Sequence, residues 1–221
     1  MSFLSGFSVN AAAGVLTFAL AFANQALIAR SLGTQGLGQF ALAATSVTVA
    51  GMIFGEWLAR GNSFHSGRES GQAGSVWRNT VIYCLLMSLV FLAAALAPPS
   101  VTADLLQPVQ ALLLAGMAAA VVAQKGFAGI LQGRDRLTAY ALIPLLFMGS
   151  YLVFNVIGLG LLQAGVTGVL GAWVCGACLA ALLAAGLSRA SGPADRRLLR
   201  STATVGSRGA LSATLIFLLF R

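Results

Sequence analysis

The sequence predicts an all-α, polytopic membrane helix bundle. Hydrophobic residues make up 58% of the 221 residues, whereas charged residues make up only 8%. A soluble domain usually carries ~25% charged residues, so this composition offers too little polar surface to cover a globule in water. The hydrophobic residues form continuous runs rather than alternating with polar ones, which favours membrane-spanning helices over a β-barrel.

Six apolar runs are long enough to cross a bilayer, since a helix needs ~20 residues to span the hydrocarbon core. A seventh run begins near residue 209 and ends at Arg221. The six runs cover residues 7–29, 38–58, 79–97, 109–131, 138–162 and 166–187. We therefore expect six transmembrane helices plus the start of a seventh.

The first run also has one feature of a signal peptide, because Ala21-Phe22-Ala23 fits a cleavage site. No Lys or Arg precedes the run, however, and the run is long enough to span the membrane, which favours a retained helix. The glycine-rich segment that follows it, residues 33–38, lacks the order of a dinucleotide-binding loop. It predicts a tight turn between two helices.

The charge distribution predicts the orientation in the membrane. Thirteen Lys and Arg residues stand against five Asp and Glu, which in a soluble chain would suggest nucleic acid as a partner. Here the loops at 59–78, 132–137 and 188–208 carry ten basic residues, whereas the alternate loops carry only Arg30. Basic loops mark the cytoplasmic side, so we expect a cytoplasmic N-terminus and no nucleic-acid partner.

The basic segment after the sixth run divides the chain. Ser191-Gly192-Pro193 interrupts the helical pattern, and the stretch from Pro193 to Arg200 fits a short amphipathic helix on the membrane surface. We expect a six-helix lobe over residues 1–190, a cytoplasmic basic linker over 191–208, and the truncated start of a second lobe over 209–221.

Polar residues inside the apolar runs are the candidates for function. Asn10, Thr17 and Asn24 are seven residues apart, so they form one stripe on a helix, with Gln25 beside it. In the fifth run, Asn155 lies about one turn after Tyr151. Hydrogen bonds between helices, worth ~0.6 kcal/mol on average, explain any single one of these residues. The stripe as a whole favours the wall of a cavity.

Two charged residues inside the runs each leave two interpretations open. Lys125 lies ~10 Å from the cytoplasmic end of the fourth run, so it either snorkels to the surface or faces a cavity that attracts an anionic ligand. Glu56 lies four residues before Arg60 at the end of the second run. It either forms a local ion pair with Arg60 or acts as a membrane-embedded carboxylate that couples transport to an ion.

The sequence contains no soluble-enzyme motif, so we expect neither catalysis nor a cofactor or metal. Cys175 and Cys178 have CxxC spacing but lie in an apolar run without the polar context of a redox or metal site. Small residues at four-residue spacing, from Ala172 to Ala184, predict close packing of the sixth helix.

Two segments carry a family resemblance. Residues 29–42 (ARSLGTQGLGQFAL) resemble the "aRxLGpexxGxyal" signature between the first two helices of polysaccharide (O-antigen type) flippases, which belong to the multidrug/oligosaccharidyl-lipid/polysaccharide exporter superfamily. Residues 131–140 (LQGRDRLTAY) are similar to the turn between helices four and five of that family, and residues 211–221 more loosely resemble the start of its seventh helix. Such flippases have two lobes, so this chain would correspond to the N-terminal half.

The resemblance implies a transporter that flips a lipid-linked oligosaccharide of the undecaprenyl-pyrophosphate type across the bacterial inner membrane, for the synthesis of surface polysaccharide such as lipopolysaccharide. It implies contacts with membrane lipids, polysaccharide polymerase and other assembly proteins. Our candidates for phosphate contacts are Arg30 and Lys125, with Arg221 completing the cavity. Those for sugar contacts are Asn24, Gln25 and Asn155.

Two alternatives remain at this stage. The first is a cation-coupled small-molecule exporter of the same superfamily, in which Glu56 would couple transport to the ion and matter more than Lys125. The second is a membrane fragment that transports nothing.

Overall fold

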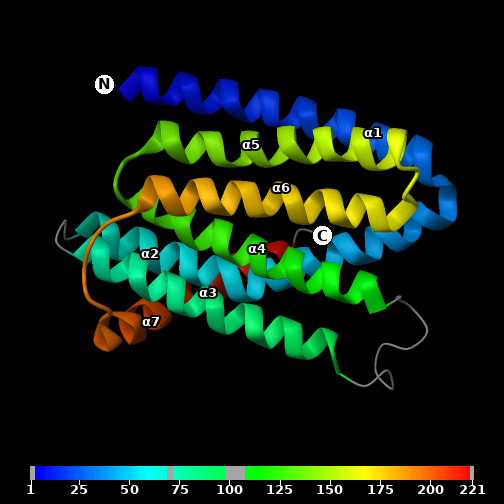
Figure 1. Cartoon of the computed structure of the whole chain (residues 1–221). Helices are drawn as coiled ribbons and strands as arrows, with labels where there is room; N and C mark the ends of the chain where they lie inside the picture. The colour runs from blue at the N-terminus through cyan, green and yellow to red at the C-terminus, as the bar shows by residue number, and fades with distance from the viewer. Residues whose placement is uncertain (1–2, 69–71, 98–107, 220–221) are drawn as a thin grey trace.

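A computed structural model describes residues 3–68, 72–97 and 108–219 as a bundle of helices (Figure 1). The described residues contain no β-strand, which confirms the all-α fold. The helices are α1 (Phe3–Ala50), the π-helical turn η1 (Gly51–Gly55), α2 (Glu56–Arg68), α3 (Ala73–Ala95), α4 (Pro108–Gly133), α5 (Leu137–Asn155), the π-helical turn η3 (Val156–Leu161), α6 (Gly165–Ser188) and α7 (Arg196–Leu219).

The label α1 covers two arms that meet at a sharp kink. Gly33 has φ of 64° and ψ of −174°, a left-handed conformation that glycine adopts without steric cost. The chain reverses direction near this point, so the two arms lie in opposite directions (Figure 1). The turn predicted from the glycine-rich segment is therefore confirmed.

The described helices match the six predicted apolar runs. Helices long and apolar enough to span a membrane cover Ser8–Arg68, Ala73–Ala95, Pro108–Gly133, Leu137–Leu161 and Gly165–Ser188. The first of these contains both arms of the kinked helix, so the five helices cover the six predicted apolar runs. The seventh predicted run overlaps α7 up to Leu219, and the side chains from residue 209 onward lie outside the described part.

The prediction of a loop at 59–78 is wrong for most of these residues, because they are helical. The second arm continues without a break through η1 and α2 to Arg68, and α3 begins at Ala73. Buried polar contacts allow this extension beyond the apolar run. The Asn62 amide donates hydrogen bonds to the Thr80 hydroxyl at 2.8 Å and to the Gly126 carbonyl at 2.9 Å, which ties α2 to α3 and α4.

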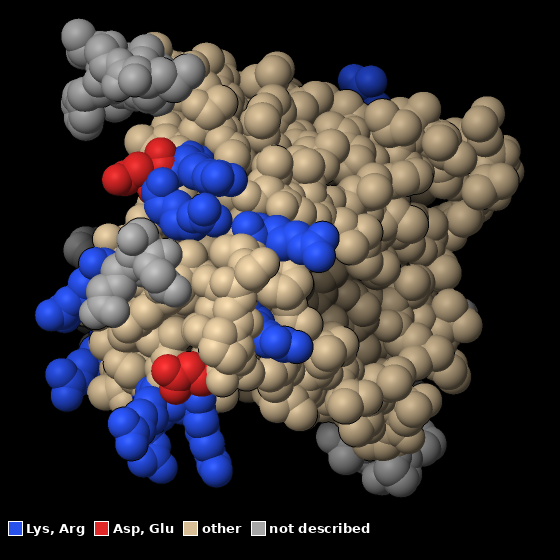
Figure 2. All heavy atoms as spheres, turned by 60° about the vertical axis from the view of Figure 1, so that its left-hand side comes forward, with Lys and Arg blue, Asp and Glu red and all other residues tan. Residues whose placement is uncertain are grey.

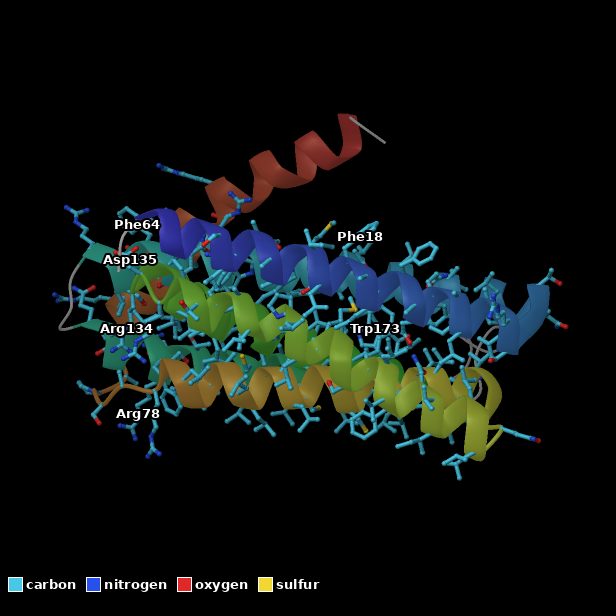
Figure 3. All side chains as sticks on the ribbon, turned by 90° about the horizontal axis from the view of Figure 1, so that it is seen from above. Phe18, Phe64, Arg78, Arg134, Asp135 and Trp173 are labelled. Atoms are coloured by element: carbon cyan, nitrogen blue, oxygen red, sulfur yellow. The ribbon has the colours of Figure 1, made fainter. Side chains whose placement is uncertain are left out.

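Glycine lets helices approach α4 and α6 closely. Gly129 and Gly133 of α4 lie against the backbone of Ala59 and Ser63 in α2. In α6 the predicted small-residue stripe is buried, and Gly176 contacts α5. Lipid chains are as apolar as the helices, so close packing of this kind stabilises a membrane bundle. Side chains on the outside remain apolar, as Phe18 at 73% exposure illustrates (Figure 3).

The helix α7 packs on α2 rather than standing apart as a linker. Its buried face presents Leu198, Thr202 and Gly206. Gly206 contacts the backbone of Trp57, and Thr202 contacts Gly61 of α2. The helix passes residue 208 without a break, so no change in backbone marks the predicted boundary between linker and second lobe. The division itself stays a prediction.

Basic residues gather at one end of the bundle, where α2 meets α3, α4 meets α5 and α6 meets α7 (Figure 2). The N-terminus lies at the same end (Figure 1). Two of these arginines also cap α6, because Arg136 donates to the Leu187 carbonyl at 2.9 Å and Arg134 to the Ser188 carbonyl at 3.3 Å. This asymmetry agrees with the charge count, and the cytoplasmic orientation of this end stays a prediction.

We expect Gly129→Ala to destabilise the bundle and Gly171→Ala to spare it. A methyl group on Gly129 would collide with the backbone of Ala59, whereas one on Gly171 in α6 would meet nothing within 4 Å. Overpacking costs ~1–3 kcal/mol, and Ala in a helix gains ~0.5–1 kcal/mol over Gly. The free energy of unfolding in detergent measures both. Equal effects at the two sites would contradict the close α2–α4 contact.

Candidate functional site

A polar cleft opens between α2, α4 and the first turn of α5, in the half of the bundle that carries the basic loops. Its volume is about 550 Å³. The lining residues are Glu56, Ala59, Arg60, Ser63, Phe64, Lys125, Ala128, Gly129, Gln132 and Tyr140. A cleft of this size is large enough for a ligand group such as a phosphate or a sugar.

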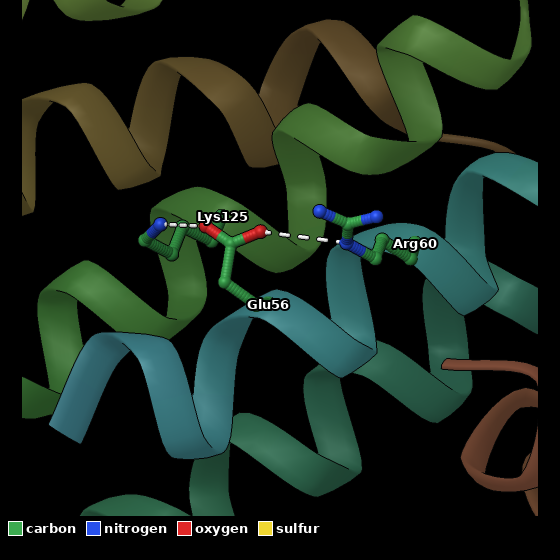
Figure 4. Close-up of polar contacts among 3 residues, drawn as sticks. All are labelled: Glu56, Arg60 and Lys125. Carbon is green, nitrogen blue, oxygen red and sulfur yellow. Dashed lines mark hydrogen bonds and ion pairs between the residues drawn. The ribbon is translucent and has the colours of Figure 1, made fainter. Parts of the chain in front are cut away.

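Three charged side chains form a network on the wall of this cleft (Figure 4). The Lys125 ammonium donates to one oxygen of the Glu56 carboxylate, and the Arg60 Nε lies 3.9 Å from the other oxygen. The side chains of Lys125 and Glu56 are 34% and 30% exposed, so both remain accessible from the cleft. Two cations face one carboxylate, and the network therefore carries a net charge of about +1.

The local sequence makes room for Lys125. Gly55 in η1 lies against the Lys125 side chain, where a Cβ would approach Cδ to 2.8 Å. Gly51, one turn earlier, leaves space for Val121 and the Lys125 Cε. A π-helical turn inside a long helix often occurs at a functional site. Here the π-helical turn η1 places Gly51 and Gly55 opposite Lys125 of α4.

The structure brings Lys125 and Glu56 together, which the sequence analysis did not predict. It also contains the predicted local contact between Glu56 and Arg60. Their similar depth in the bundle could have indicated this contact, because Glu56 and Lys125 both lie about two to three turns from the basic end of their helices. The prediction of a loop at 59–78 placed Glu56 at the end of a helix. The similar depth of the two charges was therefore not recognised from the sequence.

The predicted sugar contacts Asn24 and Asn155 hydrogen-bond to each other. The Asn155 amide donates to the Asn24 carbonyl oxygen at 2.7 Å, and the two residues are 0% and 3% exposed. The pair joins the first arm of α1 to α5. The Tyr151 hydroxyl on α5 is buried and makes no hydrogen bond with the described residues. The interhelical explanation accounts for this pair, and a role in sugar binding stays a prediction.

The other predicted contacts lie elsewhere. Gln25 is exposed on α1, and Arg30 is exposed near the kink at Gly33, at the end opposite the basic loops. Neither lines the cleft that contains Lys125. Arg221 lies outside the described residues. Gln132 and Tyr140 also line the cleft. Neither was among the predicted contacts, although both fall in the segment that resembles a flippase motif.

Within the part of the chain that the structure describes, no group of three or more His, Cys, Asp or Glu side chains is placed to hold a metal ion. The cleft network consists of one carboxylate and two cations. Such a set can bind anions through the cations or organic cations through the carboxylate.

No family model matches the sequence, and no curated protein matches it. Solved structures that share its fold include three transporter structures. An outward-facing multidrug resistance MATE family transporter of the MOP superfamily has a TM-score of 0.71 at 19% identity, with 90% of this chain and 49% of that chain covered. A MOP superfamily transporter from Pyrococcus furiosus has a TM-score of 0.68 at 19% identity, with 94% and 52% covered. A MATE protein crystallised in a complex has a TM-score of 0.66 at 17% identity, with 94% and 50% covered.

This chain therefore shares its fold with part of each of these three transporters, and it spans about half the length of each structure it matches. The fold agrees with the superfamily that the sequence motifs resemble. It does not distinguish polysaccharide flippases from other members.

A double-mutant cycle on Asn24→Ala and Asn155→Ala will measure the buried amide pair. Each single variant leaves one buried amide without its partner, so we expect the double variant to lose less stability than the sum of the two. Interhelical hydrogen bonds in membranes suggest a coupling of ~0.6–1.7 kcal/mol. The free energy of unfolding in detergent gives the coupling, and strictly additive losses would show that the two amides do not interact.

Proposed function

We propose that this chain is one lobe of a MOP-type transporter and that it works against a second lobe. The support is its fold, which matches about half of each of three such transporters at TM-scores of 0.66 to 0.71. Transporters of this kind are built from repeated bundles, with the binding site between them, and move by rocking one bundle against the other. The cleft between α2, α4 and α5 is the candidate for this lobe's share of the site.

We further propose that the substrate is a lipid-linked oligosaccharide whose pyrophosphate enters the cleft. The observation that carries this proposal is the net positive network of Glu56, Arg60 and Lys125 in a polar cleft of about 550 Å³. An anionic phosphate would compete with Glu56 for Lys125. Once Lys125 had bound the phosphate, Arg60 would still balance the negative charge of Glu56. Polar groups of Ser63, Gln132 and Tyr140 would hydrogen-bond the first sugar or the phosphate.

Arg30 enters this proposal at a different stage. It is exposed at the end of the bundle opposite the basic loops, and the cleft does not include it. The phosphate would therefore meet Lys125 and Arg30 in succession during transport, rather than at the same time.

One observation favours the alternative of a cation-coupled small-molecule exporter. Among the described residues, Glu56 is the only Asp or Glu within the helices long enough to span a membrane. A carboxylate in such a position can bind a coupling ion or a cationic substrate. One of the solved structures with the same fold is a multidrug resistance transporter. That description applies to the solved protein, and it is compatible with this alternative.

Opposite changes of charge in the cleft distinguish the two substrates. Lys125→Met removes the cation that would hold the pyrophosphate, and a charged hydrogen bond worth ~1.5–3 kcal/mol predicts a loss of oligosaccharide export of about 10–100-fold. Glu56→Gln raises the net charge of the cleft and should preserve that export. The assay is surface polysaccharide and accumulated lipid-linked oligosaccharide in cells that carry each variant as their only copy.

The controls separate charge from folding. Lys125→Arg keeps the positive charge and should retain most of the activity, and each variant must reach the membrane in normal amounts. If Glu56→Gln abolishes export while Lys125→Met preserves it, the cation-coupled exporter is the better description. If neither variant changes any transport phenotype, the chain is not part of a transporter.

The second lobe can be sought directly by mass. We expect the product of this gene in its native membrane to have roughly twice the 22.6 kDa of this chain, because the chain matches about half of each related structure. Intact mass spectrometry measures this. A product of 22.6 kDa would require the second lobe to be another copy or another protein.

A further inference from the structure

A second polar groove lies beside the cleft, between the end of α2 and the beginning of α7. Its volume is about 460 Å³. The lining residues are Phe64, His65, Arg68, Gln72, Asp195, Arg197, Leu198, Ser201 and Val205. Phe64 borders both cavities, but the groove shares no charged residue with the cleft. It is not used by the proposed transport site.

The groove carries excess positive charge. Arg68 and Arg197 are both exposed on its rim, and the Arg68 guanidinium lies 5.8 Å from the centre of the Phe64 ring. Asp195 is the carboxylate that lines the groove among the described residues. Its Oδ1 accepts hydrogen bonds from the backbone of Arg197 at 2.8 Å and Leu198 at 3.2 Å, so it caps α7.

The two walls of the groove are held in place. The Asn79 amide of α3 donates to the Asp195 carbonyl at 2.7 Å, and the Asp195 amide donates back to the Asn79 side chain at 3.2 Å. Farther along, Gly206 packs on the backbone of Trp57. The arginine of α2 and the arginine of α7 therefore project from helices whose separation is fixed.

The position and lining of the groove suit a ligand that combines a negative charge with an apolar part. It lies at the end of the bundle where the basic loops gather, with apolar side chains of Phe64, Leu198 and Val205 beside the charged ones. Anionic phospholipids at a membrane surface present a phosphate just outside their acyl chains and attract basic segments. Arginine suits such a phosphate because its planar group can donate two parallel hydrogen bonds.

We propose that this groove binds the headgroup of an anionic phospholipid, with its phosphate between Arg68 of α2 and Arg197 of α7. The bound lipid bridges the two helices and strengthens the contact of α7 with the bundle. This proposal does not depend on the transported substrate.

The test titrates phosphatidylglycerol into the full chain in detergent and follows binding by the shift of its unfolding temperature. Wild type should be stabilised by phosphatidylglycerol and not by phosphatidylcholine. The double variant Arg68→Gln/Arg197→Gln should bind about 30-fold more weakly, since each arginine near an anionic surface is worth ~1 kcal/mol.

A matched variant separates this site from general attraction to charge. Arg196→Gln/Arg200→Gln removes the same charge from exposed positions of α7 that do not line the groove, and it should lose much less affinity. Equal losses in the two double variants would overturn the proposal, as would equal stabilisation by the two lipids. Competition by millimolar inorganic phosphate would also overturn it, because the groove would then bind a soluble anion. Circular dichroism confirms that the variants are folded.

Discussion

The hydrocarbon core of a membrane offers no hydrogen-bond partners, and the rest of this structure depends on that constraint. It requires the backbone to form helices, because only helices satisfy their N–H and C=O groups within one segment. It applies equally to side chains. An isolated charge at the centre of a membrane helix costs ~2.5–3.5 kcal/mol, and the contact between Glu56 and Lys125 gives each of these charges a partner of opposite sign.

The glycines of α4 make that contact possible. Gly129 and Gly133 let the backbone of α2 approach, and Gly55 leaves space for the lysine side chain. This close approach places the Lys125 side chain beside the Glu56 carboxylate. The candidate site therefore follows from where small residues occur as much as from where charges occur. Packing and the candidate site depend on the same positions.

The sequence predicts the helices of this chain better than the contacts between them. Hydropathy locates most spans to within a few residues, because the length of an apolar run reports directly on burial in lipid. It fails at 59–78, where polar residues continue a helix beyond the apolar run. It also does not pair Asn24 with Asn155 or Glu56 with Lys125. Those pairs depend on which helices pack together, and a single sequence carries no direct record of that.

The packing of α7 bears on how two lobes could move. The contacts of Thr202 with Gly61 and of Gly206 with Trp57 involve backbone atoms, so they leave little freedom for sliding. Asp195 and Asn79 fix the beginning of the same helix to α3. In a transporter that rocks one lobe against another, residues up to Gly206 would therefore move with the lobe described here. Those same contacts would carry α7, from its cap at Asp195 to Gly206, along with α2 and α3.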